Sequence, residues 1–430
     1  MKNKINNILV LPHIQRFIKS ASWSLVGTVS GKLLMLVAFI IVARIIGKEE
    51  YGKIGVLRST ITMFMVFSSA GMGLTSARYI AYYRNSNREK AYQVYKASSQ
   101  VALIFGLVIS VIIFFFNNQI SKSSFDTPEL SLPLKLTIIA LFFSTVSSAQ
   151  SGTLTGFEDF KKLGINNLIY GIAQFFLIIL GAFFWGANGV IIFLGISSGL
   201  FVILNQISIK KHFGSEFKNV KAFTPEIKDI FKKFSVPAML STFVAMPVIW
   251  FGKALLVRSD GFGEMAIFDV SEQWYLMVLF IPNSIGAIIL PMLSNTLSEG
   301  SEKQYNKLLK LNLLVNCGVV TLLTLIIICL APFILKLYGR NFTSYLPLRI
   351  LLIAAILQTV NSVLGQVIAS KAKMWLGFGV NLFWGISFLT IAYIFVEYLN
   401  LGALGLSYAF LLSYLLHSIL QGFITFKIII

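Results

Sequence analysis

The sequence predicts an all-α integral membrane protein of about twelve transmembrane helices, arranged as two parallel-related six-helix halves. Three observations favour this fold class. The 430-residue chain is 56% hydrophobic and only 12% charged, whereas about a quarter of the residues of soluble domains are charged. Apolar segments long enough to cross a bilayer recur along the chain. Finally, the second half of the sequence resembles the first.

The composition also bears on partners. Mean hydropathy is +0.80, and a soluble core cannot bury this much apolar surface. The net charge of +19 invites comparison with nucleic-acid-binding proteins. In a chain this apolar, basic cytoplasmic loops explain the charge better. We therefore expect the lipid bilayer as a partner and no nucleic acid.

The first span follows a polar, basic stretch, residues 1–19. Residues 22–46 form an apolar run that is too long for a signal peptide, so we predict a retained helix. A short connection, Trp185-Gly186-Ala187-Asn188, predicts a tight hairpin between the fifth and sixth spans. The twelve predicted spans lie near residues 22–46, 54–81, 97–117, 134–156, 164–185, 187–209, 234–257, 269–293, 308–330, 346–369, 376–398 and 402–426.

A shift of 214 positions aligns the two halves. Polar residues and glycines carry this match, because apolar residues match easily by chance. The matched pairs include Arg44 with Arg258, Gly47 with Gly261, Glu50 with Glu264 and Asn167 with Asn381. A constant offset of this kind indicates an internal duplication. We predict an N-terminal half at 1–209, a basic cytoplasmic linker at 210–233 and a C-terminal half at 234–430.

The distribution of charge among the loops predicts the orientation. One set of loops, which includes the termini and the linker, contains 23 Lys and Arg, and the opposite set contains 10. Because cytoplasmic loops carry the excess of positive charge, both termini and the linker are expected in the cytoplasm.

Signatures of enzymes are absent from the sequence. It contains no Gly-rich loop ending in Gly-Lys-Ser/Thr, no Gly-x-Ser-x-Gly and no His-Glu-x-x-His. Its three histidines are scattered. Cys317 and Cys329 are separated by roughly 18 Å of helix, so we expect no disulfide. We expect no catalytic residue, no metal site and no cofactor.

Lys32 is the sharpest candidate for a functional residue, because it lies near the middle of the first span. Gly27, Thr28 and Gly31 share its helix face. One interpretation is the wall of a watery cavity. The other is a helix–helix seam built from small residues, with Lys32 extending towards an interface.

Three further cations are candidates for a substrate cavity. Arg44 and Arg258 occupy equivalent positions near the ends of the first and seventh spans, and Lys253 lies shortly before Arg258. Charged residues within spans are costly, so they are functional candidates by default.

Arg58 enters the second span, and its repeat counterpart in the eighth span is Glu272. The two residues either form a salt bridge across the axis that relates the two halves, or each contacts lipid headgroups separately. Asp269 and Glu272 form the acidic pair near a span. They either carry a coupling proton or neutralise neighbouring arginines.

The fourth and tenth spans are unusually polar at matching places. Gln150 in one and Gln366 in the other are examples. Polar side chains within a bilayer should face protein or water. Interhelical hydrogen bonds account for them, and contacts with sugar hydroxyls are the alternative.

The stretch Arg44-Ile45-Ile46-Gly47-Lys48-Glu49-Glu50-Tyr51-Gly52 resembles a signature of bacterial polysaccharide exporters, Arg-x-Leu-Gly-x-x-x-Tyr-Gly. These are the Wzx-type O-antigen and capsule flippases of the multidrug/oligosaccharidyl-lipid/polysaccharide superfamily. The resemblance implies a MATE/MurJ-like architecture in the bacterial cytoplasmic (inner) membrane. It also implies movement of an undecaprenyl-diphosphate-linked oligosaccharide by alternating access.

The same resemblance implies a cationic central cavity, for which Lys32, Arg44, Arg58, Lys253 and Arg258 are the candidates, and a partner in the polysaccharide polymerase machinery. A MATE-like multidrug or cation antiporter is the alternative function. A membrane glycosyltransferase is disfavoured, because the longest predicted loops are only about 25 residues.

Overall fold

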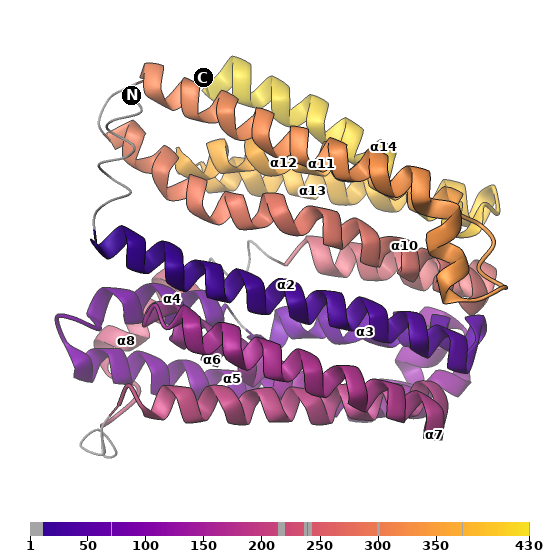
Figure 1. Ribbon diagram of the computed structural model, residues 1–430, viewed down its shortest axis with the longest axis horizontal. Helices are drawn as coiled ribbons and strands as arrows, with labels where there is room; N and C mark the ends of the chain where they lie inside the picture. The colour runs from indigo at the N-terminus through magenta and orange to yellow at the C-terminus, as the bar shows by residue number, and fades with distance from the viewer. Residues whose placement is uncertain are drawn as a thin grey trace. The chain divides into compact units, whose positions relative to one another are not determined.

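The computed structural model describes residues 12–69, 71–213, 220–235, 239, 243–298, 302–371 and 373–429. Within these ranges all regular secondary structure is helical, which confirms the all-α prediction (Figure 1). The elements are α2 (Pro12–Ile46), α3 (Lys48–Ser69), α4 (Met72–Tyr83), α5 (Arg88–Phe125), η1 (Pro128–Leu130), α6 (Ser131–Gly156), α7 (Phe160–Lys210), α8 (Pro225–Ile230), η3 (Phe231–Ser235), α10 (Ala245–Ser298), α11 (Glu302–Tyr338), α12 (Leu346–Ser370), α13 (Met374–Ala392), η4 (Tyr393–Tyr398), α14 (Gly402–Ile424) and η5 (Thr425–Ile429).

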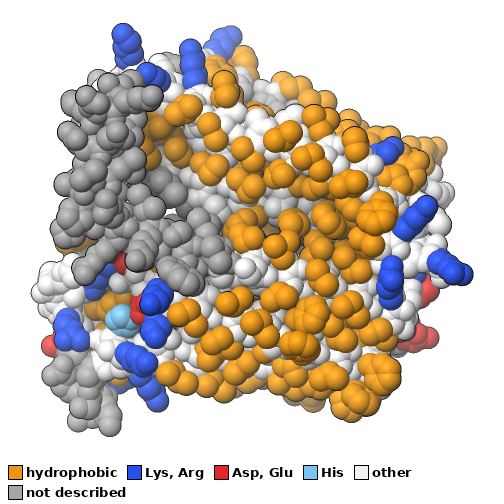
Figure 2. Space-filling model, in the orientation of Figure 1, with side chains coloured by type: hydrophobic (Ala, Val, Ile, Leu, Met, Phe, Trp, Pro, Cys, Tyr) orange, Lys and Arg blue, Asp and Glu red, His pale blue; other side chains and the backbone are white. Residues whose placement is uncertain are grey.

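Most of the predicted spans coincide with described helices. Eight helices are long and apolar enough to cross a membrane, and the bent α3–α4 pair is a ninth if it is taken as one span. The 51-residue α7 holds two of the predicted spans, which are separated by the break at Gly186. The seventh predicted span, 234–257, lies partly outside the described residues, so the total of twelve stays a prediction. Figure 2 shows that hydrophobic side chains cover most of the visible helix surface, while Lys and Arg gather towards the helix ends. This is the surface expected of a protein with a lipid solvent.

Glycines mark two of the breaks between spans. In α7 the backbone leaves the helical conformation at Trp185 and Gly186. A Cβ placed on Gly181 would lie only 2.5 Å from the carbonyl oxygen of Gly189, so the two arms of α7 are in close contact. The predicted hairpin is therefore confirmed. The predicted span 54–81 is broken into α3 and α4 next to Gly71, which has a φ of +69°.

The internal duplication is visible in the backbone. Gly47, between α2 and α3, has a φ of +82°, and Gly261, within α10, has a φ of +78°. Gly186 has a φ of +57° and Asn400 a φ of +51°. Each pair is 214 positions apart. Left-handed backbone thus recurs at the offset found in the sequence, at the points where consecutive helices join.

The chain forms two compact units. Unit 1 contains residues 1–45, 57–121 and 128–243, and unit 2 contains residues 46–56, 122–127 and 244–430. Two short segments of the first half, 46–56 and 122–127, therefore belong to the unit built mainly from the second half. The division of the sequence at 1–209, 210–233 and 234–430 stays a prediction about the duplicated halves.

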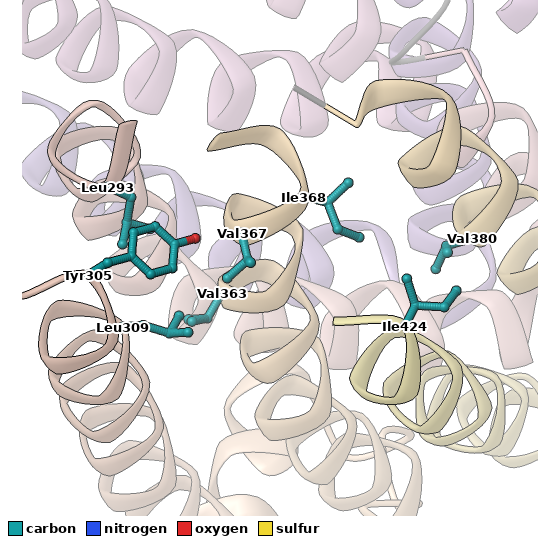
Figure 3. Packing of buried hydrophobic residues seen from close by; sticks show 8 residues of the cluster. All are labelled: Leu293, Tyr305, Leu309, Val363, Val367, Ile368, Val380 and Ile424. Carbon is teal, nitrogen blue, oxygen red and sulfur yellow. The ribbon is translucent and has the colours of Figure 1, made fainter. Parts of the chain in front are cut away.

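Unit 2 has a core in which all five of its long helices take part. Figure 3 shows side chains from α10, α11, α12, α13 and α14 lying close together. The cluster consists of Leu293, Tyr305, Leu309, Val363, Val367, Ile368, Val380 and Ile424, none more than 9% exposed. Cys317 and Cys329 in α11 are free thiols, as predicted.

The basic linker belongs to unit 1 and packs against helices α4 and α5 of that unit. Ala222, Ile227 and Ile230 of the linker join one buried cluster with Ile80, Val94 and Ala97 of α4 and α5. Lys96 Nζ donates a hydrogen bond to the carbonyl oxygen of Val220, at 2.8 Å. Residues 214–219 of the predicted linker and residues 1–11 of the N-terminus lie outside the described residues.

His212 fixes the start of the linker. Its ring stacks on Phe157, with centroids 4.3 Å apart, and its Nε2 donates to Asp159 Oδ2 at 2.9 Å. Arg88 donates to its carbonyl oxygen at 2.7 Å. Asp159 also caps the N-terminus of α7 by accepting from the amide of Lys162. The hydrogen bond from His212 holds the pKa of the Asp159 carboxyl below its usual value.

Candidate functional site

The seven predicted site residues are divided between the two units. Unit 1 holds Lys32, Arg44 and Arg58, and unit 2 holds Lys253, Arg258, Asp269 and Glu272. Lys32, Arg44 and Arg258 are exposed.

Lys253 and Glu272 form a buried ion pair. Nineteen residues of straight helix would separate them by about 28 Å. The break at Gly261 instead folds α10 back, so that Lys253 Nζ lies 2.5 Å from Glu272 Oε2. The ammonium also faces the Phe268 ring at 5.8 Å, and Lys253 is only 5% exposed. Glu272 thus neutralises a lysine, where the sequence suggested arginines. The predicted Arg58–Glu272 salt bridge stays a prediction.

Asp269 belongs to a second buried network. Gln273 donates a 2.7 Å hydrogen bond to its Oδ2 and a 2.6 Å hydrogen bond to the hydroxyl oxygen of Tyr51. Asp269 is 3% exposed, and its side chain packs against Gly55. The network ties the helix after the Gly261 break to the start of α3.

The exporter-like signature residues have a structural role in unit 2. Tyr51 is fully buried, and its ring meets Tyr338 and Phe342 edge-on at centroid distances of 6.2 and 6.0 Å. A Cβ on Gly52 would lie 1.9 Å from the carbonyl oxygen of Phe262. Only glycine permits this approach between the two backbones. The Tyr-Gly pair of the signature therefore packs the α2–α3 junction against α10 and the end of α11.

The glycines beside Lys32 form a helix seam. A Cβ on Gly27 would lie 2.2 Å from the carbonyl oxygen of Gly164, and one on Gly31 would lie 3.4 Å from that of Asn167. Small residues thus let α2 approach α7 closely. Gly27 and Gly31 therefore form the predicted helix–helix seam, whereas Lys32 itself is exposed. A cavity role for Lys32 stays a prediction.

Arg58 contacts an aromatic ring. Its guanidinium carbon lies 4.2 Å from the centroid of Phe39, within the range of a cation–π interaction. The side chain is half-buried.

Sequence reasoning missed the role of Glu264. Its carboxylate accepts from the amide of Ala403 at 3.0 Å, at the start of α14, and lies 3.8 Å from Lys48 Nζ. A carboxylate at a helix N-terminus is stabilised by the helix dipole. Its repeat counterpart Glu50 instead pairs with Lys53. The sequence signal for this role was the spacing Gly-x-x-Glu, which occurs both at Gly47–Glu50 and at Gly261–Glu264.

The polar residues of the fourth and tenth spans bond across helices. Gln150 of α6 donates to Gln206 of α7 at 3.0 Å, and Gln366 of α12 accepts from Asn312 of α11 at 2.9 Å. These contacts favour the interhelical interpretation over contacts with sugar hydroxyls.

Solved structures with this fold are membrane transporters. An inward-facing multidrug resistance MATE family transporter of the MOP superfamily superposes with a TM-score of 0.78 at 15% identity, covering 91% of this chain and 94% of that one. A MOP superfamily transporter from Pyrococcus furiosus superposes with a TM-score of 0.69 at 14% identity, covering 94% of each chain. The chain thus has the fold of this class of transporters.

The family model described as "Polysaccharide biosynthesis protein" matches residues 17–297, and the chain belongs to this family. The EPS I polysaccharide export inner membrane protein EpsE of Ralstonia solanacearum is 22% identical over 419 residues, which cover 94% of this chain and 92% of that protein. The lipopolysaccharide biosynthesis protein WzxC of Escherichia coli (strain K12) is 23% identical over 429 residues, which cover 96% and 81%.

Proposed function

We propose that this protein is a flippase that moves an undecaprenyl-diphosphate-linked oligosaccharide across the cytoplasmic membrane by alternating access. The observation that carries this proposal is the similarity to EpsE, which extends over 94% of the chain. A shared fold would not by itself identify the transported molecule.

The chemistry of the cargo fits the cations of the chain. A diphosphate carries about two negative charges, which are costly to expose to hydrocarbon. Lys and Arg side chains provide charge-assisted hydrogen bonds in place of water. Lys32, Arg44 and Arg258 are exposed and suited to this role. Lys253 is already paired with Glu272, so it would bind cargo only after exchanging partners.

The orientation follows from the loop charges. We place both termini and the basic linker in the cytoplasm, because that set of loops holds 23 of the Lys and Arg against 10 in the other. The cargo would then be delivered to the opposite leaflet, where polysaccharide polymerase machinery can use it. The protein itself acts as a transporter and not as an enzyme.

Deletion of the gene, followed by analysis of lipid-linked intermediates and staining of surface glycan, tests the proposal. We expect surface polymer to disappear and undecaprenyl-diphosphate-linked units to accumulate on the cytoplasmic leaflet. Unchanged surface glycan in the deletion strain contradicts the proposal.

The second candidate function is that of a multidrug or cation antiporter. The MATE transporter with a TM-score of 0.78 is the observation that favours it. This function predicts that the deletion strain becomes sensitive to cationic drugs while its surface glycan stays normal. The exposed cations argue against it, since they repel a cationic cargo.

A further inference from the structure

A column of buried polar side chains runs along one face of α14 and continues into η5, which begins at Thr425. His417, Gln421 and Thr425 follow one another at four-residue spacing and are 6%, 4% and 0% exposed. Within the described residues, both ring nitrogens of His417, Oε1 of Gln421 and the hydroxyl of Thr425 have no hydrogen-bond partner. Buried polar groups are nearly always bonded, so three such residues in one row call for an explanation.

Neighbouring helices add to this column. Trp384 of α13 stands beside His417, with ring centroids 6.5 Å apart, and its indole N–H is also without a partner in the described residues. Asn361 of α12 donates to the carbonyl oxygen of Tyr414 at 3.2 Å, while its Oδ1 remains unpaired there. Two carbonyl acceptors thus remain unused within the described residues: Asn361 Oδ1 on α12, and Gln421 Oε1 one turn after His417 on α14.

The column continues beyond His417 towards the ion pair in α10. Tyr414 lies one turn before His417, and its hydroxyl is 3.5 Å from that of Tyr275. Tyr275 in turn lies three residues after Glu272, the partner of Lys253. Polar groups thus extend over about 16 Å of helix from Thr425, at the start of η5, to Tyr414, and from there through Tyr275 towards Glu272, whose side chain is 13% exposed.

Four titratable groups of the described residues lie along this column. The helix of His417 itself contributes Tyr414, and α10 contributes Tyr275, with Glu272 and Lys253 beyond it as a neutralised pair. The residues from α12 and α13, Asn361 and Trp384, do not titrate. Lys253 is thus the one cation among these groups, and Glu272 neutralises it.

We propose that His417 is a proton-binding site inside unit 2, reached from the end of α14 along Thr425 and Gln421, and that its protonation is coupled to transport. Ionisable residues within membrane spans mark such proton relays in other transporters. In the uptake step a hydronium ion at the end of α14 gives its proton to a ring nitrogen and leaves as water. The coupling rests on the proposed function, whereas proton binding does not.

Tryptophan fluorescence of the purified full-length protein tests proton binding without any cargo. An imidazolium beside an indole quenches its emission, so we expect wild-type fluorescence to fall as the pH is lowered from about 8 to about 4. His417→Gln and Trp384→Phe should each lose this pH-dependent component. His212→Gln, which alters a histidine outside the spans, should retain it. An unchanged profile in His417→Gln overturns the proposal.

Proton movement is measured with the protein in liposomes that contain a pH-sensitive dye, under an imposed potassium diffusion potential. Wild-type protein should acidify the interior, and His417→Gln should fall to the level of protein-free liposomes. If His417→Gln does not fold, Gln421→Leu, which keeps the histidine, should slow acidification. Proton entry that is absent from wild type or unchanged in these variants overturns the proposal. The glycan phenotype of the deletion strain tests the proposed function separately.

Discussion

Lys253 and Glu272 each depend on the other for their stability inside unit 2. Replacing Lys253 by Ala leaves a buried carboxylate unpaired, so we expect the protein to lose about 3 kcal/mol of stability. A variant with both Lys253→Met and Glu272→Leu should recover most of this loss, because neither charge remains. Thermal unfolding of the detergent-purified variants measures the effect. A single variant as stable as wild type contradicts the account of the pair.

Asp159 makes the attachment of the linker depend on pH. Its pKa in the folded protein is lowered, chiefly by the hydrogen bond from His212, so its contribution is present above the unfolded value of about 3.9 and is lost as the pH falls through the folded value. Asp159→Asn keeps a helix cap but removes the charge. We expect faster tryptic cleavage of the lysine-rich linker in this variant near neutral pH.

Wild-type protein should show the same loosening only in acid, below about pH 4, where an acid-stable protease replaces trypsin. Lys228→Ala, a change at an exposed linker residue, is the control and should leave the pH dependence intact. Equal cleavage rates in wild type and Asp159→Asn at neutral pH would show that the carboxylate does not anchor the linker.

Substitution of Lys32 is the most direct test of the cavity hypothesis. Lys32→Ala should abolish surface polysaccharide while the amount of membrane-inserted protein stays normal, because an anionic headgroup would lose its countercharge within the first span. Complementation of the deletion strain, with glycan staining and immunoblotting, measures both quantities. Lys32→Arg should retain function. Normal glycan in Lys32→Ala removes this residue from the proposed cavity.

At the scale of helices, the close approach at Gly52 determines how the α2–α3 junction packs. In Gly52→Ala the new Cβ would lie 1.9 Å from the carbonyl oxygen of Phe262, so the backbones must separate. We expect a lower unfolding temperature for this variant. Gly318→Ala in α11 is the matched control, since nothing lies within 4 Å of the added Cβ there, and alanine favours the helix. Equal melting of both variants would contradict the packing account.

The sequence predicted which helices exist better than it predicted their contacts. The matched pair Gly47 and Gly261 located two breaks, because left-handed backbone requires a residue without a Cβ. The Lys253–Glu272 pair was not predicted, since it depends on how α10 folds back at Gly261. Apolar spans match almost any partner, so periodicity alone gives no pairing between distant helices.

The linker shows a second limit of the sequence. Its lysines predicted a basic cytoplasmic linker, and this prediction left out the apolar pair Ile227 and Ile230. Their three-residue spacing places both on one face of α8. Burial of that face against α4 and α5 holds the linker on unit 1. The signal was present, but a six-residue helix is too short for periodicity to stand out.

At the scale of the whole molecule, the predicted orientation has a direct test. A fluorescent protein fused after residue 430 should be fluorescent, because it folds in the cytoplasm. Alkaline phosphatase inserted at Gly186, in the turn of the α7 hairpin, should be active, because this enzyme requires the opposite compartment. The reverse pattern would overturn the orientation while leaving the fold unaffected.

The docking of Tyr51 also sets an order of events during synthesis. Its buried ring contacts Tyr338 and Phe342, and its hydroxyl accepts from Gln273, all of which are made more than 200 residues later. The ribosome therefore completes the entire first half before this tyrosine can find its neighbours. Until α10 and α11 have entered the membrane, the α2–α3 junction has no site to occupy. The first half of this chain consequently cannot reach its final structure before most of the second half exists.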